Sequence, residues 1–115
     1  MRVLVCGGRD FADMGLFSRT MIEVGNSLGP ISSIIAGGAR GADTMAKHLA
    51  HAWNVPFRMF KADWNKHGKA AGPLRNQRML DEGKPDLVVA FPGGRGTADM
   101  VRRARAAGIE VREIS

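Results

Sequence analysis

The chain has 115 residues, 44% of them hydrophobic, and a net charge of +6. This length suits one ordinary domain, so residues 1–115 are expected to form a single unit around one core. No apolar run approaches the roughly 20 residues that span a bilayer, so no membrane association is expected. A single cysteine, with no signal peptide ahead of the first strand-like run, favours a cytoplasmic protein. The basic charge favours an anionic partner, either a nucleotide, a nucleic acid or an acidic surface.

Five apolar runs alternate with stretches of helical periodicity. Residues 13–28 carry Phe17, Met21, Val24 and Leu28 at helical spacing, which predicts one buried stripe. Three further helices are expected over residues 43–53, from near Pro73, and over residues 97–107. Residues 61–72 are predicted to be a long irregular loop, which in a compact domain is more often functional than idle. The expected strands are residues 3–6, 34–36, 57–60, 87–91 and 109–114.

Alternating strands and helices predict an α/β fold with a parallel sheet and right-handed crossovers. The middle three runs are nearly continuous in apolar residues, as in strands buried on both faces, whereas the last alternates like an edge strand. The expected strand order is 3-2-1-4-5. Ligands bind such sheets beyond the carboxyl ends of the strands, where the order reverses, here between the first and fourth strands.

Three glycine-rich loops follow expected strands and lead into expected helices. Glycine lets the backbone approach a ligand closely, and a helix N-terminus offers free N–H groups to an anion. Each loop also carries an arginine (Arg9, Arg40 or Arg95), whose guanidinium binds phosphate with two hydrogen bonds. Together they predict a site for a phosphorylated small molecule. The loops are residues 7–10, 37–43 and 92–97.

Two common nucleotide motifs are absent. Gly94 and Gly96 are followed by Asp99 where the dinucleotide fingerprint has its third glycine. The glycine, lysine and serine or threonine pattern of triphosphate-binding loops does not occur either. His48 and His51 have no third ligand beside them in the sequence, so no metal site is predicted. No cofactor is predicted.

The combined motifs resemble the SLOG superfamily, in its YspA-like branch related to YpsA, which is common in bacteria and their phages. The similar segments are Gly-Gly-Arg-Asp-Phe at 7–11, Gly-Gly-Ala-Arg-Gly-Ala-Asp at 37–43, Ala-Gly-Pro-Leu-Arg-Asn at 71–76 with Met79, and Pro-Gly-Gly-Arg-Gly-Thr at 92–97. The resemblance implies a Rossmann-like three-layer fold that binds nucleotides or nucleotide-derived ligands. It also implies pairing into homodimers, which the apolar faces of this chain do not decide.

Two more distant relatives imply different activities. Lonely Guy phosphoribohydrolases use an arginine and a glutamate; Arg75 matches the arginine, but Met100 stands where the glutamate would be. Asp99 is the neighbouring carboxylate, one residue and about 100° around the helix from that position. Asn76 likewise replaces the lysine of their helix motif. DNA-processing A proteins, which act on single strands, carry a loop similar to residues 38–43.

Several candidate residues have two readings from sequence alone. Asp43 is either the cap of its helix or a ligand for a ribose hydroxyl, and Thr97 is a cap, a phosphate ligand or both. Trp64 either stacks on a base or anchors the long loop to the core. Arg75 and Asp99 are the candidate catalytic residues, with Asp10 or Asp43 as alternatives to Asp99. The expected ligand-binding residues are Gly7, Gly8, Arg9, Asp10, Gly37, Gly38, Arg40, Gly41, Asp43, Trp64, Gly72, Arg75, Asn76, Pro92, Gly93, Gly94, Arg95, Gly96 and Thr97.

Three functions follow from these readings, and the sequence leaves open whether the protein is an enzyme. The first is a module that senses or sequesters a nucleotide or nucleotide-derived ligand. The second is an N-glycosidic hydrolase of a nucleoside 5′-monophosphate or an ADP-ribose-like substrate. The third is binding of single-stranded nucleic acid, suggested by the positive charge and Trp64.

Overall fold

The computed structural model describes residues 1–115 and contains one five-stranded parallel sheet, in the order β3-β2-β1-β4-β5. This confirms the predicted α/β fold and strand order. β1 is central and pairs with β2 through Val3 and Ile34, and with β4 through Leu4 and Val88. The strands are β1 Arg2–Cys6, β2 Ser33–Gly37, β3 Phe57–Phe60, β4 Leu87–Ala90 and β5 Glu110–Glu113.

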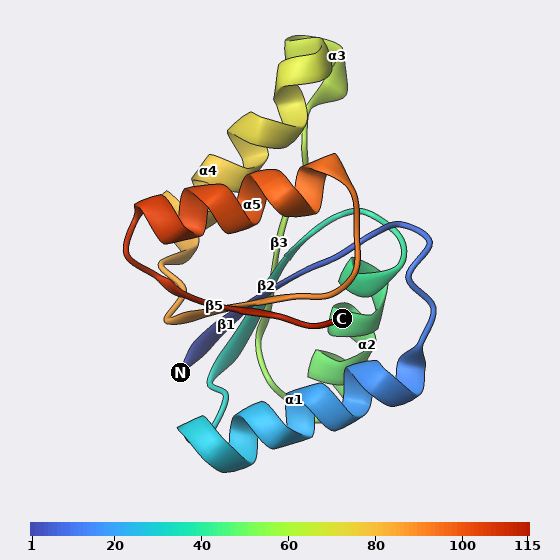
Figure 1. Cartoon of the computed structure of the whole chain (residues 1–115). Coiled ribbons are helices and arrows are strands. Elements are labelled where there is room, and N and C mark those ends of the chain that lie inside the picture. Colours follow the sequence, from blue (N-terminus) through green and yellow to red (C-terminus); the bar gives the residue numbers. More distant parts are fainter.

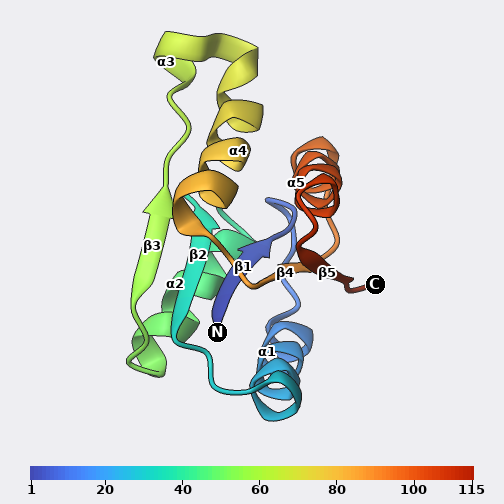
Figure 2. The same cartoon turned by 90° about the vertical axis from the view of Figure 1, so that its left-hand side faces the viewer.

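Helices cover both faces of the sheet, so the domain has three layers (Figure 1). The pair α1 and α2 lies on one face, and the pair α4 and α5 lies on the other, as the turned view in Figure 2 also shows. The helices are α1 Met14–Leu28, α2 Ala42–Ala52, α3 Trp64–His67, α4 Ala71–Gly83 and α5 Arg95–Ala106, with a 3-10 turn over Gly68–Ala70.

Each face of the sheet has its own apolar cluster, because side chains alternate along a strand. On one face, Phe17, Met21 and Val24 of α1 pack on β1, β2 and β4, as the predicted stripe requires. Leu28, at the end of that stripe, is instead 39% exposed, because α1 ends there. On the other face, side chains of α4 and α5, including Met79 and Met100, pack against alternate residues of the same strands.

The prediction that the third strand is buried on both faces is wrong. In β3 only Phe60 is buried, while Arg58 and Met59 are exposed. The strand order explains this, because β3 lies at the edge of the sheet and has a neighbour on one side only. Arg58 covers the ring of Phe60 from outside, with its guanidinium carbon 5.1 Å from the ring centre.

Residues 61–72 are mostly helical, which corrects the prediction of an irregular loop. Asp63 caps α3 by accepting a hydrogen bond from the Lys66 N–H at 3.1 Å. After the 3-10 turn, α4 begins at Ala71, so Pro73 is its third residue and not its first. Proline fits there because no N–H group in the first turn of a helix has an intrahelical acceptor. In both views α3 lies at the opposite end of the molecule from α1 (Figures 1 and 2).

The three glycine loops meet at the backbone of Gly8. Its N–H donates to the Pro92 carbonyl at 2.9 Å, and its carbonyl accepts from the N–H groups of Phe11 and Ala42 at 3.3 and 3.5 Å. Gly41 has φ +80°, and a Cβ there would run into the Gly8 carbonyl oxygen. A Cβ on Gly93 would lie 2.7 Å from the Gly8 nitrogen. The glycines in these loops therefore let three backbones touch one another.

We expect Gly41→Ala to destabilise the domain by about 2 kcal/mol or more, because it adds both the cost of a positive φ and a backbone clash. Urea unfolding would measure this loss. Gly25→Ala is the matched control, since Gly25 lies inside α1 with nothing within 4 Å of its would-be Cβ. That change is expected to stabilise the domain by about 0.5–1 kcal/mol. Equal effects of the two changes would contradict the role assigned to Gly41.

Candidate ligand-binding site

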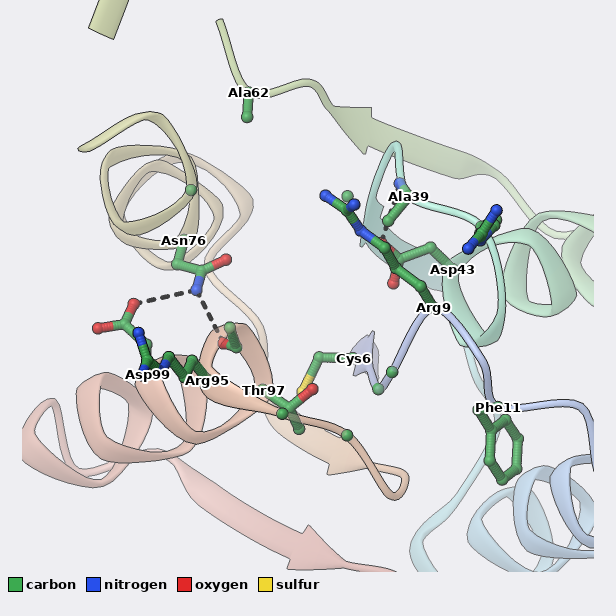
Figure 3. Close-up of a pocket in the computed structure, with 18 of the residues that line it drawn as sticks. Cys6, Arg9, Phe11, Ala39, Asp43, Ala62, Asn76, Arg95, Thr97 and Asp99 are labelled. Atoms are coloured by element: carbon green, nitrogen blue, oxygen red, sulfur yellow. Dashed lines mark hydrogen bonds between the residues drawn. The ribbon is translucent and has the colours of Figure 1, made fainter. Parts of the chain in front are cut away.

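An open cleft of about 1600 Å³ lies at the carboxyl ends of the strands. The loops after β1, β2, β3 and β4 line it together with the starts of α4 and α5, and Figure 3 shows their side chains facing one another. The cleft therefore lies where the strand order reverses beside β1, as predicted. The predicted residues that line it are Gly7, Gly8, Arg9, Asp10, Gly37, Gly38, Arg40, Asp43, Trp64, Gly72, Arg75, Asn76, Pro92, Gly93, Gly94, Arg95, Gly96, Thr97 and Asp99.

Three details of the predicted set differ in the structure. Gly41 does not line the cleft; it lies beneath, against the Gly8 backbone. Asp43 is not the cap of α2, because Gly41 holds that position, and Gly94 caps α5 in place of Thr97. The two helices thus begin one and two residues earlier than predicted, at Ala42 and Arg95, and the polar side chain of each lies within the first turn.

The start of α5 presents unpaired backbone donors to the cleft. The first intrahelical hydrogen bond runs from the Ala98 N–H to the Gly94 carbonyl at 3.0 Å, so the N–H groups of Arg95, Gly96 and Thr97 have no backbone acceptor. A Cβ at Gly94 or Gly96 would meet nothing within 4 Å. Free N–H groups at the positive end of a helix dipole favour an anion.

Arg75 is held at the start of α4 with part of its guanidinium free. Its Nε donates to Asn76 Oδ1 at 3.1 Å, and its Nη1 donates to the Phe60 carbonyl at 3.4 Å. No protein acceptor engages Nη2. Burial lowers the pKa of Arg75 from its ordinary value, and the nearby Asp43 carboxyl acts in the opposite direction.

Asn76 joins α4 to α5 and is only 4% exposed. Its Nδ2 donates to the Gly96 carbonyl at 3.2 Å and to Asp99 Oδ2 at 3.0 Å, as the dashed lines in Figure 3 show. With Oδ1 accepting from Arg75, the whole amide is engaged within the protein. Sequence reasoning placed Asn76 among ligand-binding residues, and the structure shows that it holds both walls of the cleft in place.

Asp99 is likewise engaged within the protein. It accepts hydrogen bonds from Asn76, from Arg102 at 2.8 Å and from Arg103 at 2.9 Å. Burial by itself raises the pKa of Asp99, but these hydrogen bonds together hold that pKa below its usual range. Met100, at the glutamate position of the hydrolases, is fully buried in the core. Asp99 is thus poorly suited to donate a proton to a substrate.

Asp43 lies in the opposite environment, in the floor of the cleft. It is 8% exposed, and its Oδ2 accepts from the Ala39 N–H at 3.2 Å. Burial raises the pKa of Asp43 to about 7, although the Ala39 hydrogen bond and the Arg75 charge act against that rise. The neighbouring thiol of Cys6 has its pKa raised to about 12, by burial first and by Asp43 second. Cys6 is therefore a neutral thiol.

Gly37 brings Arg75 and Asp43 together. A Cβ on Gly37 would lie 2.8 Å from the guanidinium carbon of Arg75 and 3.0 Å from Asp43 Oδ2. The guanidinium and the carboxyl therefore both lie within about 3 Å of the position that a Gly37 Cβ would take. They form no ion pair with each other.

Most of the positive charge in the cleft is uncompensated. Arg40 pairs with Asp10 at 3.6 Å on the exposed rim. The other cationic side chains that line the cleft form no ion pair; they are Arg9, Lys61, Lys69, Arg75 and Arg95. Sequence reasoning did not include Cys6, Phe11, Asp13, Ala39, Lys61 and Met79 among the lining residues, although Lys61 directly follows a predicted strand.

Trp64 lines the cleft from α3 and is 52% exposed. A Cβ on Gly72 would lie 3.3 Å from the Trp64 ring, so the tryptophan rests on the first turn of α4 and not on the core. One part of the ring stays open to solvent. Asn65, Lys66 and His67 are exposed on α3 and do not line the cleft.

No group of three or more histidine, cysteine or acidic residues is placed to hold a metal ion. None of the helices combines the length and the apolar character that crossing a membrane requires.

Fold and cleft together define an α/β domain of the Rossmann-like class, with glycine loops gathered at the switch point of its sheet. Residues 1–67 match the family described as YspA, cpYpsA-related SLOG, and the chain belongs to this family. A relative, the Gene 61 protein of Mycobacterium phage D29, is 45% identical over 85 residues, which cover 68% of this chain and 67% of the phage protein. The predicted resemblance is confirmed.

The environment of Asp43 predicts a pH dependence of stability. Because the pKa of this carboxyl rises from 3.8 to about 7 on folding, the folded state holds the proton more tightly than the unfolded state. The stabilisation that the protonated Asp43 provides is complete below pH 3.8 and is lost as the pH rises to about 7. The free energy of unfolding of Asp43→Asn should therefore rise by about 4 kcal/mol relative to that of the parent protein between pH 4 and pH 8. Urea unfolding at both pH values measures this, and a constant difference would contradict it.

Proposed function

We propose that this protein binds a phosphorylated nucleotide or nucleotide-derived ligand in the cleft, as a sensor or sequestering module. Membership of the SLOG family supports nucleotide-related binding or processing. The observation that carries the proposal is the set of unpaired cations facing the free N–H groups at the start of α5. Phosphate oxygens match both kinds of donor. Trp64 offers an aromatic face on which a base stacks.

Binding without turnover is the preferred form of this proposal over N-glycosidic hydrolysis. Hydrolysis of that kind uses a carboxyl group beside the sugar, and the two positions nearest the relatives' glutamate are unsuited to it. Met100 is buried in the core, and Asp99 is bound by three donors. Release of free base from a panel of nucleoside monophosphates, above that of protein-free controls, would overturn this preference.

Single-stranded nucleic acid is a second candidate ligand. The exposed Trp64 lies in α3 close in sequence to three other exposed side chains, those of Lys66 and His67 in α3 and of Lys69 in the 3-10 turn that follows. Stacking and phosphate contacts of this kind give affinity that falls steeply with salt. Titration of a short oligonucleotide at two salt concentrations, with Trp64→Ala as the comparison, decides between this ligand and a free nucleotide.

The first test is native mass spectrometry of freshly purified protein, followed by identification of any released molecule under denaturing conditions. We expect a stoichiometric nucleotide-like mass, which would also report whether the chain forms homodimers. A protein that carries nothing and binds no nucleotide in a subsequent calorimetric panel would contradict the proposal.

Arg75→Ala is expected to weaken binding of the ligand by about 2–3 kcal/mol, because a charge-assisted hydrogen bond is lost in a partly buried site. Isothermal titration calorimetry with the ligand that mass spectrometry identifies measures the loss. Arg19→Ala is the control, since Arg19 is exposed on α1, outside the cleft, and its removal changes the net charge equally. Unchanged affinity in Arg75→Ala would remove Arg75 from the site.

A further inference from the structure

Four carboxyl groups line the cleft, and three of them already have partners. Asp10 pairs with Arg40 on the rim, and Asp13 caps α1 by accepting from the Leu16 N–H at 3.0 Å. Asp99 accepts from Asn76, Arg102 and Arg103. Asp43, like Asp13, has no cationic partner within ion-pair distance and accepts a hydrogen bond through one oxygen only, Oδ2, but Asp43 is buried whereas Asp13 is exposed. The Oδ1 of Asp43 is thus the one carboxyl oxygen in the cleft floor that nothing in the protein engages.

The Asp43 carboxyl and the Arg75 guanidinium belong to the same small region, where Asp43 Oδ2 and Arg75 Nη1 both lie against the Gly37 backbone. Both groups border the point that a Gly37 side chain would occupy, and Nη2 of Arg75 has no protein acceptor. An anion that binds this guanidinium therefore comes to lie beside the Asp43 carboxyl. Two anions in contact repel each other, whereas a neutral carboxylic acid donates a hydrogen bond to the anion.

We infer that Asp43 binds the anionic group of the ligand as a neutral acid, donating a hydrogen bond from the oxygen that Ala39 leaves free, so that binding takes up one proton. This inference rests on the proposed function and deepens it, because it assigns the donor set for the phosphate in the cleft floor: Arg75 as a cation and Asp43 as an uncharged donor.

The surroundings of Asp43 explain why a proton would be taken up on binding. The groups that face it are the Cys6 thiol of β1, Arg75 of α4 and, beyond Arg75, Arg9 of the loop after β1. Cys6 stays neutral, so Arg75 provides the charge that favours an ionised Asp43. A bound anion neutralises that charge. The carboxyl, whose pKa is already about 7 in the free protein, then holds its proton more tightly.

The test uses calorimetry with two probes, AMP and inorganic sulfate. Sulfate is included because its charge does not change between pH 6.5 and pH 8.5, and no histidine lines the cleft. For the parent protein we expect the Kd for sulfate to rise about 10-fold or more across this range. Parallel titrations at pH 8 in two buffers of different ionisation heat should show close to one proton taken up per anion bound.

Asp43→Asn is the decisive variant, because the amide keeps an acceptor for the Ala39 N–H and permanently offers a donor in place of the acid. Its Kd for sulfate should change less than about 2-fold over the same pH range, with no proton uptake. Asp81→Asn, an exposed position on α4 outside the cleft, removes the same charge and should keep the parent's pH dependence.

The outcomes separate this inference from the proposed function. Binding whose pH dependence is the same in the parent protein and Asp43→Asn, or binding without proton uptake, overturns the role of Asp43 and leaves the ligand site standing. Failure of both AMP and sulfate to bind at any pH overturns the inference together with the phosphate site on which it rests.

Discussion

The structure depends above all on the close backbone contact around Gly8. The Gly8 carbonyl accepts hydrogen bonds from the N–H groups of Phe11 and Ala42, and the Gly8 N–H donates to the Pro92 carbonyl. These bonds join the loops that follow β1, β2 and β4. Such an approach requires glycine, because a Cβ on Gly41 or Gly93 would collide with the Gly8 backbone, and a Cβ on Gly8 would lie only 3.1 Å from Gly93 Cα. The floor of the cleft is consequently a hydrogen-bonded unit that does not need a ligand to assemble it.

The walls of the cleft depend on a second set of contacts, made by side chains. Asn76 engages α5 through Gly96 and Asp99 while accepting from Arg75, so one buried amide sets the position of α5 relative to α4. Buried polar groups of this kind are stabilising only when all are paired, and here every side-chain nitrogen or oxygen that is fully shielded from solvent has a partner. The cleft then presents free donors from two sides, the N–H groups at the start of α5 and the guanidinium of Arg75 on α4.

Two carboxyl groups of the cleft illustrate how surroundings set chemistry. Asp99 has three donors around it and its pKa is lowered, whereas Asp43 is buried with one backbone donor and its pKa is raised to about 7. The sequence presents both as aspartates near glycine loops. The pKa values differ because Arg102 and Arg103 donate hydrogen bonds to Asp99, whereas Asp43 is buried beside the Cys6 thiol.

The sequence by itself determined the α/β class and the edge of the sheet where the cleft lies, because apolar periodicity and glycine loops are local signals. The strand order was an expectation for a fold of this class, and the structure confirms it. The sequence also pointed to Arg75 and to the arginines of the loops. Only the tertiary structure decided that β3 is exposed, that residues 64–70 are helical, that Gly41 supports the floor, and that Asn76 and Asp99 are engaged within the protein. Most of these properties arise from contacts between residues far apart in the chain, such as Gly8 with Pro92 and Asn76 with Gly96, and no local pattern encodes such pairs. The cap of α3 by Asp63 is instead a local contact that the sequence analysis missed.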